Sequence, residues 1–196
     1  MSVSIPFGKL EEGVQKSLEN AARYFEDAVL LFHNGRYLSS ILLSMHSFEE
    51  SAKALLLMNY RSNDKAITKS QWHKKFSSHV VKNPVPLKTI LPNSDDTPES
   101  SEIRISVSRL SVKWKNIFSY TDYDFEKLKW TSPTDTKSIG ISDVKSHSSA
   151  NIVRAGKALK AAMEKAMRIE RVREALSQVD ESFKMAIKIV REGIDF

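Results

Sequence analysis

The 196-residue chain contains no cysteine. Disulfide bonds, thiolate metal sites and a cysteine nucleophile are therefore excluded. Glycine and proline are also scarce, with six residues of each, which favours helices over a turn-rich all-β fold. No apolar stretch reaches the roughly 18 to 20 residues that a membrane span needs, and the N-terminal residues lack the regions of a secretion signal. We therefore expect a soluble, cytoplasmic protein with no membrane contact.

Composition and charge are those of a globular protein with two basic segments. Apolar residues make up 41% and charged residues 28%, and the length predicts one domain over residues 1–196. Residues 65–91 hold six Lys and no acidic residue, and residues 145–173 hold eight Lys or Arg against two Glu. Both segments are compatible with a phosphate-bearing partner such as RNA, although solvated helix faces produce similar counts.

Helical spacing is clearest in the N-terminal third. Apolar residues from Leu10 to Phe32 fall on one helix face, and Asn34 and Gly35 supply a stop signal. A second helix is predicted from about Arg36 to Tyr60. Because it is apolar nearly all round, we expect neighbours to bury it on several sides.

The rest of the chain predicts further helices separated by loops. A short third helix begins at Thr68, which has capping-box spacing with Gln71. A loop at about 83–97 leads to a fourth helix over about 97–120, and a loop at 121–147 precedes one long helix at 148–192. An extra step of three between Ile169 and Val172 predicts a rotated stripe or a kink in that helix. The fold class is all-α: an up-and-down helical bundle with a long C-terminal helix.

Four ionisable residues stand inside the apolar second helix. His46, Glu49, Glu50 and Lys53 are three or four residues apart, so their side chains share one polar patch. Surrounding leucines predict partial burial, which makes the patch either an internal salt-bridge cluster or a working site. Lys53 occupies the place of the histidine ligand in a carboxylate-bridged di-iron bundle. We therefore expect no metal and no other cofactor.

Two further clusters carry candidate residues. In QWHKKFSSHVVK (71–82), His79 and Lys82 are one turn apart, although a lone histidine is more often a packing residue than a catalyst. In WKNIFSYTD (114–122), the apolar residues face the core, which leaves Lys115, Asn116 and Tyr120 to point elsewhere. This stretch also fits an ordinary helix C-terminus that ends in a lysine and a packed tyrosine.

The order of these motifs resembles the AbiV family of bacterial abortive-infection proteins, which is placed in the HEPN superfamily of all-helical domains. The resemblance spans about residues 15–190. It rests on Gly-Arg-Tyr at 35–37, EESAK at 49–53, the Trp, His and Lys of the second cluster, KNIFSYTD at 115–122 and Trp-x-x-Pro at 130–133.

The resemblance implies a metal-independent ribonuclease. Many HEPN proteins dimerise so that an Arg-x(4–6)-His motif lies in a cleft between two chains. The matching stretch here begins at Lys115 and Asn116 and ends at Tyr120, so Lys replaces Arg and Tyr replaces His. Lysine neutralises phosphate without the bidentate fork. Tyrosine, with an ordinary pKa near 10, is a poor general base at neutral pH.

Two hypotheses follow. The first is an antiviral HEPN-like effector that acts as a homodimer on RNA or the translation machinery, with a phage-encoded protein as a possible trigger. Its expected site comprises Glu49, Glu50, Lys53, Lys115, Asn116 and Tyr120, with His79 and Lys82 as supporting phosphate or proton-transfer groups. The alternative is a non-catalytic dimerisation or protein-interaction module, in which the same polar residues form a structural network.

Overall fold

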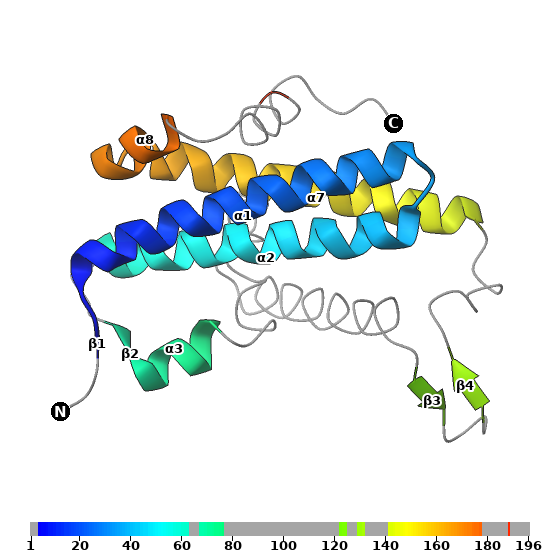
Figure 1. Cartoon of the computed structure of the whole chain (residues 1–196), viewed down its shortest axis with the longest axis horizontal. Coiled ribbons are helices and arrows are strands. Elements are labelled where there is room, and N and C mark those ends of the chain that lie inside the picture. The colour runs from blue at the N-terminus through cyan, green and yellow to red at the C-terminus, as the bar shows by residue number, and fades with distance from the viewer. Residues whose placement is uncertain are drawn as a thin grey trace, which may run out of the picture.

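Three long helices make up most of the described chain. The computed structural model describes residues 4–62, 67–76, 122–124, 129–131, 141–177 and 188. Helices α1 (Phe7–His33), α2 (Tyr37–Ser62) and α7 (Ile141–Ala166) lie side by side, and α2 and α7 run opposite to α1 (Figure 1). The predicted all-α class is confirmed. The predicted loop at about 83–97 and helix over about 97–120 lie outside the described residues.

The turn between α1 and α2 is the predicted stop. Gly35 has a φ of 71°, a left-handed conformation that favours glycine. Its N–H donates to the Phe32 carbonyl at 3.0 Å, and the Arg36 N–H donates to the Leu31 carbonyl at 2.8 Å. These two bonds satisfy carbonyls that the end of α1 would otherwise leave unpaired. The chain therefore reverses within three residues, and α2 returns along α1.

Replacing Gly35 with alanine is expected to lower the free energy of unfolding by about 1 kcal/mol, because a Cβ atom strains the left-handed backbone. Urea denaturation measures the change. Gly8→Ala is the matched control, since the added Cβ would lie in ordinary contact at 3.8 Å from Arg171. Equal effects of the two substitutions would show that the backbone at Gly35 is not strained.

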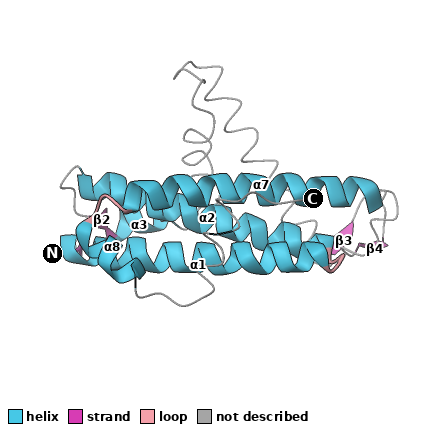
Figure 2. Ribbon diagram, turned by 90° about the horizontal axis from the view of Figure 1, so that it is seen from above, coloured by secondary structure: helices cyan, strands magenta, loops and turns pink. Residues whose placement is uncertain are grey.

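The core lies among the three long helices. Seen from above, α1 and α7 flank α2 (Figure 2). Fully buried side chains from all three helices meet there: Leu10, Val14, Leu18, Phe25, Leu57, Met58, Ile152 and Leu159. A second, smaller apolar contact joins the first turns of α2 and α7, where Ile41 and Met45 pack with Val144.

Helix α3 (Lys69–Phe76) begins at the predicted capping box. The Thr68 N–H donates to the Gln71 side chain at 3.0 Å, and the Gln71 N–H donates to the Thr68 hydroxyl at 3.2 Å. Strand β2 (Ile67–Thr68) precedes it and pairs antiparallel with β1 (Ser4–Ile5). Trp72 stacks on Phe76 at 4.4 Å between ring centres. This unit holds the beginning of α1 close to α3.

The predicted loop at 121–147 is wrong at two places. Strands β3 (Asp122–Asp124) and β4 (Lys129–Thr131) form a short antiparallel pair, and α7 begins at Ile141 rather than at Ser148. The first turns of α7 carry few apolar residues, so periodicity did not reveal them. Ser148, which is fully buried, occupies an inward position of α7 that an apolar residue would have marked.

The predicted single helix at 148–192 is also wrong. Helix α7 ends at Ala166, and a separate helix, α8 (Glu170–Ser177), packs against α1. The break falls at the predicted extra step of three. Ile169, Val172 and Leu176 are all buried in the core cluster to which α1 contributes. The chain has no proline or glycine at the break, so packing rather than local sequence ends α7.

Four serines, and not only apolar residues, line the face of α2 toward the core. Ser40, Ser44, Ser47 and Ser51 are completely buried. The Ser40 hydroxyl donates to the Ala28 carbonyl of α1, and the Ser47 hydroxyl donates to the Ala21 carbonyl, each at 2.7 Å. Small side chains on both helices allow α1 and α2 to pack close together. This close packing determines which residues of the two helices contact each other at the edge of the interface.

Candidate functional site

The α2 polar cluster, which we define as His46, Glu49, Glu50 and Lys53, is largely withdrawn from solvent. Glu49 is 6% exposed, and the side chains of Glu50 and Lys53 are 17% and 23% exposed. By contrast, the Lys9–Glu12 pair on α1 is 67% and 43% exposed. The predicted partial burial of the cluster is therefore confirmed. The Glu50–Lys53 ion pair is not simply a solvent-exposed pair.

Within the α2 polar cluster, Glu50 is bonded through one oxygen only. The Lys53 ammonium donates to Glu50 Oε1 at 2.5 Å. The second oxygen, Oε2, is buried and accepts no hydrogen bond from any described residue. A buried acceptor without a donor costs free energy of folding. This oxygen can accept a proton or a hydrogen bond from a bound molecule, while Lys53 beside it can neutralise an anion.

The remaining predicted site residues lie outside the described part of the chain. They are His79, Lys82, Lys115, Asn116 and Tyr120. Of the predicted site, the described structure pairs Glu50 with Lys53, and Glu49 lies on the same helix, α2. The convergence of the other five residues on this cluster stays a prediction.

Sequence reasoning missed a group on α1 that borders the α2 polar cluster. The Tyr24 ring lies 5.4 Å from the His46 ring, and the Arg23 guanidinium lies 5.3 Å from the centre of the Tyr24 ring. The Asn20 side-chain oxygen accepts a hydrogen bond from Arg23 at 3.1 Å. The spacing of Asn20 and Arg23 on one helix is visible in the sequence. Their approach to His46 is not, because it depends on how α1 packs on α2.

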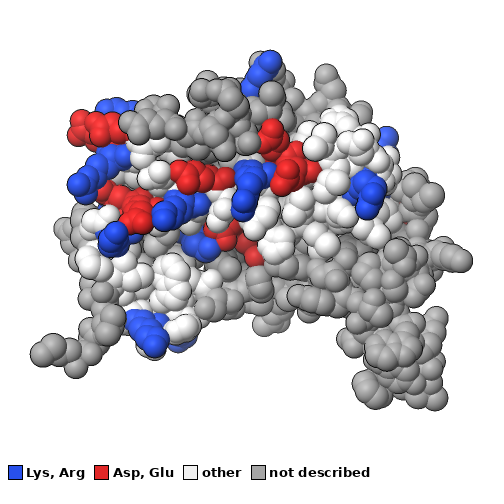
Figure 3. Space-filling view, in the orientation of Figure 1, with Lys and Arg blue, Asp and Glu red and all other residues white. Residues whose placement is uncertain are grey.

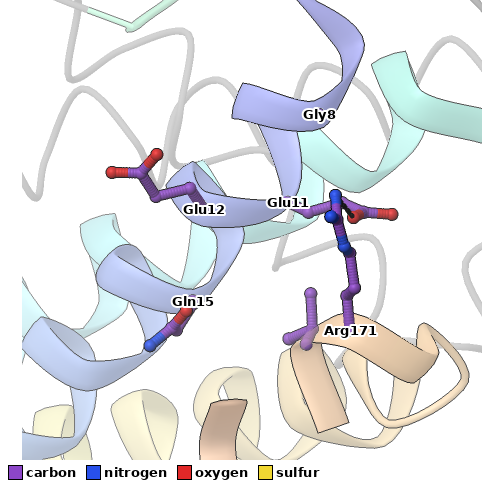
Figure 4. A pocket seen from close by; sticks show the side chains of 6 residues that line it. Gly8, Glu11, Glu12, Gln15 and Arg171 are labelled. Carbon is purple, nitrogen blue, oxygen red and sulfur yellow. Dashed lines mark ion pairs between the residues drawn. The ribbon is translucent and has the colours of Figure 1, made fainter. Parts of the chain in front are cut away.

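A second polar group joins α1, α2 and α8. Glu11 is 9% exposed, and its Oε1 lies 2.8 Å from Arg61 Nε of α2. Its Oε2 lies 3.9 Å from a guanidinium nitrogen of Arg171 on α8. Figure 4 shows the Glu11 carboxylate turned toward Arg171, while Glu12 points away. The bond to Arg61 therefore joins α1 to α2, whereas the Arg171 side chain is 77% exposed and adds only a weak contact from α8.

A pocket of about 230 Å³ lies beside Glu11. It is lined by Gly8, Glu11, Glu12, Gln15, Arg171 and Val172. Its polar groups are already engaged. Glu12 is paired with Lys9 and Lys16, whose hydrogen bonds and charges hold the pKa of its carboxyl below the usual value. Gln15 donates to Glu19 at 2.8 Å. We therefore assign no chemistry to this pocket.

The basic segment at 145–173 does not form one cationic surface. Arg154 is half-buried, and burial lowers the pKa of its guanidinium. Lys165 donates to Asn59 of α2 at 2.6 Å, and Arg171 faces Glu11. Three of the eight cations thus have contacts with other residues of the bundle, although the Arg171 side chain remains 77% exposed.

The described residues contain neither a metal-binding cluster nor a membrane-spanning helix. No group of three or more His, Asp or Glu within the described ranges could hold a metal ion. Nor is any helix in that part of the chain long and apolar enough to cross a membrane.

Comparison with known proteins identifies the family. The model of the HEPN family described as AbiV matches residues 9–154, which include most of α1, all of α2 and α3, and the first half of α7. The matched range contains the α2 polar cluster and the stretch KNIFSYTD. No curated protein and no solved structure matches the chain. Since the match covers well over half of the residues, the chain belongs to the AbiV family of HEPN-domain, abortive-infection proteins.

Proposed function

We propose that this abortive-infection protein is a metal-independent ribonuclease that uses the α2 polar cluster as half of its active site. The observation that carries the proposal is the buried Oε2 of Glu50, which lacks a donor beside the charged Lys53. A carboxylate oxygen is an acceptor for the proton of a ribose 2′-OH. A neighbouring ammonium stabilises the charge that develops on the phosphate.

The proposed step is a transesterification within the RNA. Glu50 takes the proton of the 2′-OH, the 2′ oxygen attacks the adjacent phosphorus, and the bond from phosphorus to the 5′ oxygen breaks. The products are a 2′,3′-cyclic phosphate and a 5′-hydroxyl end. A phenol is a poor base at neutral pH but can donate a proton, so Tyr120 protonates the leaving oxygen and regains its proton from Glu50 through water. Lys53 and Lys115 neutralise the phosphate oxygens.

The other expected residues support this step. Asn116 and Glu49 orient the reacting groups, and His79 and Lys82 bind the neighbouring phosphate. We further propose that a homodimer brings two copies of the site together, as the HEPN resemblance implies. RNA of the translation machinery is the proposed target, and a phage-encoded protein is the proposed trigger.

RNA cleavage in EDTA tests the proposal. Purified protein is expected to cleave cellular RNA, and Glu50→Gln, Lys115→Ala and Tyr120→Phe are each expected to lower the initial rate by about 100-fold or more. Lys16→Ala is the matched control, because Lys16 is an exposed lysine whose partner Glu12 lies on α1. Its rate is expected to equal that of the unchanged protein.

Two outcomes would contradict the proposal. If the unchanged protein cleaves no RNA under any condition, the ribonuclease function is wrong. If all variants cleave at the same rate, the activity belongs to a contaminating nuclease or to another site. A protein that arrests growth without cleaving RNA would instead favour the interaction module.

A further inference from the structure

Arg23, Tyr24 and His46 form a continuous polar and aromatic contact from α1 to α2. Tyr24 is the central member, since both the Arg23 guanidinium and the His46 ring lie within 5.4 Å of its ring centre. Tyr24 and His46 are half-buried, whereas Arg23 is exposed. His46 is followed one helical turn later by Glu50, so this contact ends at the α2 polar cluster.

Arg23 has a neutral side chain as its hydrogen-bond partner. The part of the chain that the structure describes contains no ion pair to Arg23, although Asp27 stands one turn further along α1. The guanidinium instead turns back to Asn20, which uses one of its five N–H donors. On the same helix, Lys9 and Lys16 both pair with Glu12. Arg23 therefore differs from the other α1 cations.

On the face that carries α1, basic side chains (Lys, Arg) lie among acidic side chains (Asp, Glu), as Figure 3 shows. An exposed arginine that is held over an aromatic ring and by a neutral amide keeps its charge and most of its donors for another molecule. A guanidinium presents two parallel N–H groups to the oxygens of one phosphate. The contact with the Tyr24 ring restricts the positions of this guanidinium before a ligand arrives.

We propose that Arg23 is a phosphate-binding residue beside the α2 polar cluster and that Tyr24 is the residue that positions it. The ligand is the phosphodiester backbone of RNA. This inference rests on the proposed function.

The test measures RNA binding separately from cleavage. A short, fluorescently labelled 2′-O-methyl RNA has no 2′-OH to react, and its anisotropy in EDTA gives Kd at several salt concentrations. Arg23→Gln is expected to raise Kd by about tenfold and to lower the slope of log Kd against log salt by about 0.7, the loss of one phosphate contact on a single strand. Arg23→Lys, which keeps the charge without the fork, should fall between Arg23→Gln and the unchanged protein.

Lys16→Gln is the matched control, because Lys16 lies on the same face of α1, seven residues before Arg23, and the same charge is removed. It should leave Kd within about twofold and the salt slope unchanged. Tyr24→Leu should weaken binding through a less well-positioned Arg23 and leave the slope nearly unchanged. Circular dichroism confirms that each variant is folded.

The outcomes separate this inference from the proposed function. If the unchanged protein cleaves RNA but Arg23→Gln binds the 2′-O-methyl RNA as tightly as Lys16→Gln does, the role of Arg23 is wrong and the ribonuclease proposal stands. If the unchanged protein binds no RNA, both are wrong. If polyglutamate displaces the RNA as efficiently as unlabelled RNA, Arg23 recognises negative charge in general, and the assignment to a phosphodiester is overturned.

Discussion

Replacing Ser47 with leucine is expected to lower the free energy of unfolding by about 3 kcal/mol. Ser47 is completely buried where α2 meets α1, and its hydroxyl donates to the Ala21 carbonyl at 2.7 Å. Leucine removes this hydrogen bond and adds three carbon atoms between helices that approach through small side chains. The helices must move apart, which also disturbs the fully buried Ala22 and Phe25.

Two variants separate the causes in urea denaturation. Ser47→Ala removes the hydroxyl without adding volume and should cost about 1 kcal/mol. Ser39→Leu makes the same chemical change on α2 at a half-buried position and should change stability by less than about 1 kcal/mol. If Ser47→Leu lowers the free energy of unfolding no more than Ser39→Leu does, α1 and α2 do not pack as closely at Ser47 as described.

The first two helices could be predicted from the sequence because local signals and packing agree there. Apolar spacing marks the buried face of α1, and Gly35 ends the helix where its left-handed φ is needed. The capping box at Thr68 and Gln71 is likewise a local signal, and both of its hydrogen bonds are present. Each of these features depends on residues within a few positions of one another.

The C-terminal region could not be predicted in the same way. Apolar spacing continues across residues 166–172, and no proline or glycine interrupts it, so the sequence reads as one helix. The break depends on the burial of Ile169 and Val172 near α1, which is a contact between distant segments. At the other end of α7, the buried Ser148 concealed the first turns of the helix from a search for apolar residues.

In the candidate site, too, features that depend on neighbouring residues could be predicted, and contacts between distant segments could not. Partial burial of Glu50 and Lys53 followed from the leucines around them on one helix. The contact of α1 with this cluster could not be predicted, because no spacing in the sequence connects Arg23 and Tyr24 with His46. Only the packing of α1 on α2, which depends on buried serines, places these residues next to the cluster.

The strongest test of function against structure is the double variant in which Glu50 becomes leucine and Lys53 becomes methionine. It removes both charges and the buried oxygen without a donor, and it keeps similar side-chain volumes. Replacing a partly buried ion pair with apolar residues is often neutral or stabilising. We therefore expect the free energy of unfolding to stay the same or to rise by about 1 kcal/mol. The rate of RNA cleavage, and the fraction of cells whose growth the protein arrests, are each expected to fall by about 100-fold or more.

The single variants and a control pair make the result decisive. Glu50→Leu alone leaves the Lys53 ammonium half-buried without its partner and should lower stability by about 1 to 2 kcal/mol. Removing the exposed Lys9–Glu12 pair in the same way should leave growth arrest unchanged. A double variant at 50 and 53 that is stable and still arrests growth would mean that these charges are needed neither for stability nor for activity, and the proposed site would be wrong. A stable double variant without arrest would assign them to the chemistry, because a structural role predicts that activity follows stability.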